Sequence, residues 1–170
     1  MLKVGDKAPD FTLDGRLGPK TLSEARAKGR YAVVYFYPRD DTPGCTREAQ
    51  AFSKASKAFE KAGAVVYGLS KDSRESHVKF ADKCGITIDL LSDPDLVTHK
   101  AYGAHGEKTM YGKKVMGTIR STFIVDPSGT IARVFPSVKV DGHAEKVLDA
   151  IAELKMGTPA KKPRGKAGAL

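Results

Sequence analysis

The sequence predicts an α/β fold in which helices flank a central mixed β-sheet, and three observations support this prediction. Two apolar runs without polar alternation, "YAVVYFY" (31–37) and "AVVYGLS" (64–70), are typical of strands buried on both faces. A helical pattern lies between them, and a strand–helix–strand unit implies parallel pairing. The turn sequence "DPSG" (126–129) then separates two further strand-like runs, which predicts an antiparallel hairpin.

The first of the longer helices is expected from Pro43 to Ala62. Its apolar positions recur at intervals of three and four residues: Cys45, Ala49, Phe52, Ala55 and Phe59. Gly63 follows at the position where a left-handed C-terminal cap is favoured. This pattern places Cys45 on the buried face of the helix, in its first turn.

Two more helices are expected before the hairpin. Ser73 opens one that ends before Gly85, with His77, Phe80, Ala81 and Cys84 on a single face. Ser92 is interpreted as the N-cap of a short helix, with Pro94 in its first turn and its end at Gly103.

The C-terminal part of the pattern is a hairpin followed by a helix. "STFIVDPSGTIARVF" (121–135) predicts the two antiparallel strands, and the last helix is expected from about Asp141 to Lys155. Strand, helix, strand, helix, hairpin, helix is the order of the thioredoxin fold, a three-layer α/β/α sandwich, with the short helix as an insertion. We expect residues 1–157 to form one such domain.

Composition and charge exclude several classes of protein. No apolar run is long enough to span a bilayer, and the N-terminus lacks the apolar core of a signal peptide, so we expect a cytoplasmic protein without a membrane partner. Residues 158–170 supply four of the net nine positive charges and no acid, and we expect a disordered basic tail. Aromatic residues are not interleaved with the Lys/Arg clusters, so no specific nucleic-acid binding is predicted.

Cys45 and Cys84 are the two cysteines, separated by 38 residues. They form neither a disulfide framework nor a zinc-ligand pattern, and in a reducing cytoplasm free thiols are expected. The four histidines show no metal-ligand spacing and are interpreted as surface or helix-packing residues. We therefore predict no metal and no cofactor.

The stretch "PRDDTPGC" before the first long helix favours a reactive cysteine. Thr42 is the expected N-cap, although Asp41 is an alternative, and Cys45 lies in the first helical turn. The unpaired N–H groups and positive dipole end at a helix N-terminus stabilise a thiolate, which is the nucleophilic form of cysteine. A neighbouring hydroxyl, two prolines and Arg47 add to this environment, whereas a structural cysteine needs none of these features.

These residues resemble a known family. "FYPRDDTPGCTREAQAF" is similar to the active-site loop of the peroxiredoxins, in particular the bacterioferritin comigratory protein (PrxQ) branch. The resemblance continues through "VGDKAPDFTL", "LLSDPD", "YGKKVMGTIRSTFIVD" and "GTIARVF" to the last helix, and leaves out only the basic tail. It implies a thioredoxin fold and thiol-dependent reduction of hydrogen peroxide and organic (alkyl) hydroperoxides in antioxidant defence.

The resemblance also assigns roles. Cys45 matches the peroxidatic cysteine, Thr42 the hydroxyl that bonds peroxide and thiolate, Pro38 the residue that shields the thiolate, and Arg120 the arginine at the site. An attacked peroxide places negative charge on the leaving oxygen, which fixed donors must stabilise. Without the resemblance, Arg120 would be interpreted as an exposed edge residue. Glu48, one turn after Cys45, either orients an arginine by bidentate pairing or is a solvated helix residue.

The sulfenic acid formed on Cys45 must meet a second thiol. Many relatives carry that thiol five residues further on, where this sequence has Gln50. We expect Cys84 to resolve instead, with local opening of both helices and thioredoxin as reductant. Alternatively Cys84 is structural, and a one-cysteine enzyme uses an external thiol such as glutathione or glutaredoxin.

Two rival interpretations and the assembly state stay open. "TPGC" has the layout of a thiol–disulfide oxidoreductase motif with threonine in place of the first cysteine, but dithiol exchange needs that cysteine. A chaperone role is not addressed by the sequence. By analogy with the family we expect a monomer or a weak dimer.

Overall fold

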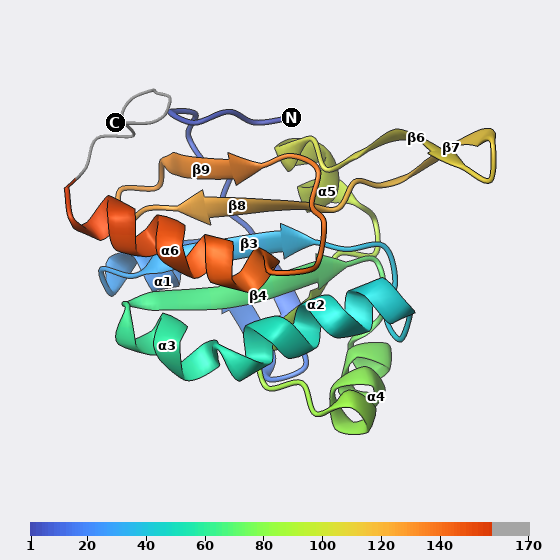
Figure 1. Ribbon diagram of the computed structural model, residues 1–170, viewed down its shortest axis with the longest axis horizontal. Helices are drawn as coiled ribbons and strands as arrows, with labels where there is room; N and C mark the ends of the chain where they lie inside the picture. Colours follow the sequence, from blue (N-terminus) through green and yellow to red (C-terminus); the bar gives the residue numbers. More distant parts are fainter. Residues whose placement is uncertain (158–170) are drawn as a thin grey trace.

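The computed structural model describes residues 1–157, and the predicted tail (158–170) lies outside the described residues. Its main sheet has seven strands in the order β2-β1-β5-β4-β3-β8-β9 (Figure 1). Pairing is parallel within β3-β4 and β4-β5 and antiparallel elsewhere, which confirms a mixed sheet. The strands are β1 (Thr12–Gly15), β2 (Gly18–Thr21), β3 (Tyr31–Phe36), β4 (Ala64–Ser70), β5 (Asp89–Ser92), β8 (Ser121–Val125) and β9 (Ile131–Phe135).

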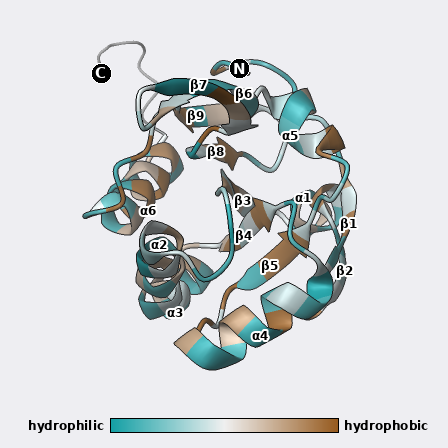
Figure 2. Ribbon diagram, turned by 90° about the vertical axis from the view of Figure 1, so that its right-hand side faces the viewer, coloured by the Kyte–Doolittle hydropathy of each residue, from teal (hydrophilic) through white to brown (hydrophobic). Residues whose placement is uncertain are grey.

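Helices cover both faces of this sheet (Figure 2). They are α1 (Leu22–Ala27), α2 (Pro43–Lys54), α3 (Ser56–Lys61), α4 (Arg74–Cys84), α5 (Val97–Tyr102) and α6 (His143–Lys155). The apolar faces of α2, α3, α4 and α6 share one core cluster with Val33 and Tyr35 of β3. Leu22 of α1 and Tyr102 of α5 belong to a second cluster on the opposite face. The expected three-layer thioredoxin fold is confirmed.

Most predicted helix boundaries agree with the structure. The Ser73 side chain accepts a hydrogen bond from the Ser76 N–H (3.1 Å), and Gly85 ends α4 in the left-handed conformation (φ 68°). Gly103 ends α5 in the same way (φ 73°). The last helix starts at His143, two residues later than expected.

Two helix predictions are wrong in detail. The helix expected over 43–62 is divided at Ala55 into α2 and α3, close to Ser53, whose hydroxyl accepts a hydrogen bond from the Thr87 N–H. Ser92 is not an N-cap, because it ends β5 and pairs with Asp14 of β1. The carboxylate of Asp93 takes over the capping and accepts bonds from N–H groups at the start of α5.

Several elements carried too little sequence signal to be predicted. These are the N-terminal hairpin β1-β2 and the short α1, which precede β3, and the strand β5, which lies between α4 and α5. A second hairpin, formed by β6 (His105–Met110) and β7 (Lys113–Thr118), extends away from the body (Figure 1). Its strands are mostly polar and exposed, so they lack the apolar alternation by which a strand is recognised.

Buried positions explain two further features of the sequence. Gly68 lies in mid-strand because a Cβ there would approach Cζ of Tyr35 to 2.6 Å. His77, His99 and His143 are buried residues of three helices, so for them the helix-packing interpretation holds and the surface interpretation does not. Among residues 1–157, no helix is both long and apolar enough to cross a membrane.

Candidate active site

The start of α2 positions Cys45. Thr42 is the N-cap, with extended backbone (φ −104°, ψ 155°), Pro43 is the first helical residue and Cys45 the third. Asp41, the alternative cap, lies outside the helix with a left-handed backbone (φ 59°). The first backbone hydrogen bond of α2 is donated by the N–H of Thr46 to the Thr42 carbonyl (2.8 Å). The preceding N–H groups are free to stabilise negative charge.

The hydroxyl of Thr42 does not cap the helix. It donates to the Arg39 carbonyl at 2.9 Å, within the loop between β3 and α2. This bond holds the half-buried Thr42 side chain beside the helix start.

Arg120 reaches the cysteine from a distant part of the chain. It immediately precedes β8, which pairs with β3, and its Nη2 lies 3.2 Å from the Cys45 Sγ. The guanidinium crosses over Gly44, where a Cβ would lie 3.3 Å from Nη2. Cys45 is 1% exposed, so this contact is shielded from solvent. Arg120 therefore contacts Cys45 and is not an exposed edge residue.

Glu48 holds the other side of the same guanidinium. Its Oε1 accepts a bond from Nη1 of Arg120 at 2.6 Å, while Oε2 has no hydrogen-bond partner within residues 1–157. Pairing is thus through one oxygen and not bidentate, because Arg120 divides its nitrogens between Glu48 and Cys45. Burial raises the pKa of Glu48 to about 7, although Arg120 lowers it. Burial lowers the pKa of Arg120, but Glu48 and Cys45 together raise it above its usual value.

Two other predicted contributors, Arg47 and Pro38, have other neighbours in the structure. Arg47 points to Asp141, with 3.9 Å between Nε and Oδ1, and both side chains are largely exposed. Arg47 therefore does not provide the cation at Cys45, contrary to the expectation from sequence. Pro38 follows β3 closely and lines a groove of about 190 Å³, whose other walls include Leu96, Lys108, Met110, Val115 and Met116.

Cys84 is the last residue of α4 and is half-buried against the same core cluster as Cys45. Both thiols are free. The side chain of Gln50 donates to the Cys84 carbonyl at 3.0 Å, so the end of α4 lies against α2. Gln50 is five residues beyond Cys45, roughly 7.5 Å along the helix axis. The structure thus places the two cysteines on neighbouring elements.

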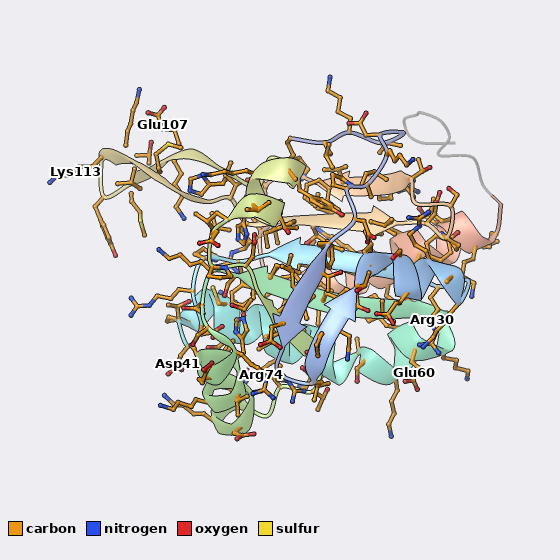
Figure 3. The ribbon with its side chains drawn as sticks, turned by 180° about the vertical axis from the view of Figure 1, so that it is seen from behind. Arg30, Asp41, Glu60, Arg74, Glu107 and Lys113 are labelled. Carbon is orange, nitrogen blue, oxygen red and sulfur yellow. The ribbon has the colours of Figure 1, made fainter. Side chains whose placement is uncertain are left out.

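No motif in the sequence indicated how the loop before α2 is held. Asp40 is buried there, and its carboxylate is bonded by Tyr37, Ser76 and His77. A further contact joins the exposed Asp41 to Lys83 of α4 at 2.8 Å (Figure 3). The one available signal was His77 on an otherwise apolar helix face.

This arrangement suits nucleophilic thiol chemistry. A thiolate at Cys45 faces a guanidinium and the free N–H groups of a helix start, and each of these stabilises an anion. The same donors can bond an oxygen that gains negative charge when the sulfur attacks it.

Comparison with known proteins agrees with this chemistry. Residues 4–134 match the AhpC/TSA family. A putative peroxiredoxin bcp of Helicobacter pylori is 44% identical over 150 residues, covering 88% of this chain and 98% of the relative. Peroxiredoxin Bcp of Xanthomonas campestris is 45% identical over 142 residues, covering 84% and 88% respectively.

Solved structures show the same relationship. Peroxiredoxin Q of Xanthomonas campestris superimposes with a TM-score of 0.80 at 40% identity, covering 89% of this chain and 96% of that one. A second structure, of the bacterioferritin comigratory protein of the same organism, has a TM-score of 0.81 at 39% identity and covers 91% and 98%. The chain therefore belongs to the AhpC/TSA family and is a thiol peroxidase of the peroxiredoxin Bcp/PrxQ type.

Proposed function

We propose that this peroxiredoxin reduces hydrogen peroxide and alkyl hydroperoxides with Cys45 as the nucleophile. The observation that carries the proposal is the contact of 3.2 Å between Arg120 Nη2 and the buried Cys45 Sγ at the start of α2. One of the similar structures concerns alkyl peroxide reduction by the Xanthomonas campestris protein, which supports the alkyl substrate class.

The first step consumes the peroxide. The Cys45 thiolate attacks one peroxide oxygen, so that an S–O bond forms and the O–O bond breaks. The leaving oxygen departs with the electron pair and takes up a proton, which yields water or an alcohol. Arg120 and the Cys45 N–H stabilise the developing charge, and Thr42 joins them when its hydroxyl turns from the Arg39 carbonyl. Glu48 orients Arg120, and Pro38 shields the sulfur.

The second step forms a disulfide. The Cys84 thiolate attacks the sulfenic sulfur of Cys45, an S–S bond forms and hydroxide leaves, to be protonated to water. The contact of Gln50 with the Cys84 carbonyl supports this assignment, because it brings the end of α4 next to α2. Since α2 and α4 are both intact, the step requires their local opening. A dithiol reductant such as thioredoxin then restores both thiols.

The enzyme is proposed to act in the cytoplasm. Two free thiols fit a reducing cytoplasm. We assign the catalytic domain to residues 1–157 and propose a monomer that acts without cofactor.

Mass spectrometry tests the cycle. The reduced protein receives one equivalent of hydrogen peroxide and is trapped at once with a sulfenic-acid reagent. A Cys45–Cys84 disulfide, replaced by a trapped sulfenic acid in a Cys84→Ser variant, is the expected result. An adduct on Cys45 with Cys84 untouched in the wild type would establish the one-cysteine alternative with an external thiol, and an unmodified Cys45 would overturn the proposal.

A further inference from the structure

A buried carboxylate ties the active-site loop to α4. Asp40 lies between β3 and α2 and is 6% exposed. Its Oδ1 accepts a bond from the Tyr37 hydroxyl (2.6 Å), and its Oδ2 lies 2.8 Å from both the Ser76 hydroxyl and Nδ1 of His77. The backbone N–H of Asp40 donates to Asp72 at 2.8 Å. Every one of these bonds joins the loop to itself or to the region where α4 begins.

Hydrogen bonds also fix the ring of His77. His77 is fully buried, and its Nε2 lies 3.0 Å from the carbonyl of Leu91. A carbonyl is an acceptor only, so Nε2 carries a proton and donates it there. A second proton joins Nδ1 to the Asp40 carboxyl, and with that proton on the ring the contact is an ion pair. A buried polar pair of this kind is stable only while its remaining hydrogen bonds are complete.

The two ends of α4 are held very differently. Ser76 and His77, near its start, contribute buried contacts to Asp40. In its last turn Ala81 and Cys84 pack against the core, but the polar contacts are exposed to solvent: the Cys84 carbonyl with Gln50, and Lys83 with Asp41. Exposed polar contacts contribute little, so the end of the helix opens more readily than its start.

We propose that Asp40 and His77 are positioning residues of the peroxidase reaction. Their ion pair holds the loop of Thr42, and with it the N–H groups around Cys45, on the fixed start of α4 while the turn that carries Cys84 opens. This inference rests on the proposed function of Cys45. Loosening the pair misplaces the donors that attack requires, and a displacement of about 1 Å costs up to a hundredfold in rate.

The test compares two buried pairs of the same kind. Asp40→Asn keeps the size of the side chain but replaces the carboxyl that faces His77 with an amide. Asp93→Asn makes the same change in the pair of Asp93 with His99, where Oδ2 and Nδ1 are 2.7 Å apart and the side chains are as buried as in the first pair. That second pair belongs to the start of α5, and the bonds of the Asp93 carboxylate are to Thr98 and His99.

Two properties are measured: the second-order rate constant of Cys45 oxidation by hydrogen peroxide, and the pH profile of Cys45 alkylation by iodoacetamide. Asp40→Asn is expected to lower the rate constant about tenfold or more and to displace the alkylation profile to higher pH. Asp93→Asn is expected to lower thermal stability while both properties stay within about twofold of wild type. Equal effects of the two variants, or no effect of Asp40→Asn, would overturn the proposal.

Milder changes and the wild type itself keep the test decisive if Asp40→Asn does not fold. Ser76→Ala removes one donor and keeps the ion pair, so a fall of about threefold is expected. In the wild type, amide hydrogen exchange of Asp40 and His77, whose N–H groups donate to Asp72 and to the Ser73 carbonyl, should be slower than that of Lys83 and Cys84. Faster exchange at the start of α4 would contradict the proposal. Alkylation and exchange need no peroxide, so they still test how Asp40 and His77 hold the loop if the proposed peroxidase step fails.

Discussion

A single guanidinium serves two partners at Cys45. Arg120 donates through Nη1 to Glu48 (2.6 Å) and through Nη2 to the sulfur (3.2 Å), and both acceptors are buried while Arg120 itself is half-buried. The planar fork of an arginine allows the two bonds to form together, whereas an ammonium group offers one nitrogen only. The orientation of the donor at the thiol therefore depends on a carboxylate one helical turn away.

Arg120→Lys is expected to lower the rate constant of Cys45 oxidation about a hundredfold, because one nitrogen cannot reach both Glu48 and the sulfur. Rapid-mixing kinetics with hydrogen peroxide measure this change. Arg47→Lys is the matched control, since Arg47 follows Cys45 closely on α2 but points to Asp141. A comparable loss in the control would show that the effect does not depend on the contacts of Arg120 with Glu48 and Cys45.

The raised pKa of Glu48 predicts that the stability of the fold depends on pH. Burial raises its pKa from 4.5 to about 7. Between these values the folded protein binds more protons than the unfolded chain, so the free energy of unfolding decreases as pH rises from about 4.5 to about 7. The stabilising contribution of Glu48 is fully present below about pH 4.5 and is lost above about pH 7. It amounts to about 3 kcal/mol at most.

Glu48→Gln removes this titration. Urea unfolding at about pH 5 and about pH 8 should therefore show a smaller loss of stability at the higher pH in the variant than in the wild type. An equal loss in both proteins would mean that Glu48 does not titrate in this range.

Two hydrogen bonds join α2 to the end of α4 and to the segment that follows it. Gln50 donates to the Cys84 carbonyl, and the Thr87 N–H donates to the Ser53 hydroxyl, each at 3.0 Å. Both bonds are exposed to solvent. They close the junction that must open when Cys84 reaches Cys45, so their strength limits how often the open form occurs.

Gln50→Ala should accelerate formation of the Cys45–Cys84 disulfide about fivefold, because the lost hydrogen bond contributes about 1 kcal/mol to the closed junction. Rapid quenching after peroxide addition, followed by non-reducing mass spectrometry, gives this rate. Lys54→Ala, an exposed change one turn further along α2, should leave it unaltered. An unchanged or slower rate in Gln50→Ala would show that this contact does not limit opening.

Across the molecule as a whole, the sheet separates two core clusters, and the site lies at the end of β3 on the side of α2. The strands that support the site are the central ones, β3, β4 and β8, which are buried on both faces. The site therefore lies on the most protected part of the fold within residues 1–157.

Removing residues 158–170 should leave the melting temperature and the peroxidase rate within experimental error of the full chain. The deletion lowers the formal net charge from +9 to +5, since it removes four cations and no acid. Elution from heparin at lower salt is expected as the one clear change. A lower melting temperature would show that the catalytic domain extends beyond residue 157.

Local signals in the sequence predicted a large part of the fold. Continuous apolar runs identified β3 and β4, turn chemistry identified the β8-β9 hairpin, and caps placed Thr42 and Cys45 at the start of a helix. The strands of the polar hairpins were missed because they depend on their partner strand and not on an apolar face. Similarly, nothing local distinguished the exposed Arg47 from the half-buried Arg120.

A nucleophilic cysteine at a helix N-terminus, within a mixed α/β fold, could be inferred from sequence alone, because capping and burial depend on a few neighbouring residues. The groups that meet that cysteine are set by tertiary contacts. Pairing of β8 with β3 brings Arg120 across 75 positions to Cys45, and packing of α4 against the loop creates the ion pair of Asp40 with His77. Contacts between residues so far apart follow from how elements pack together, which no short stretch of sequence encodes.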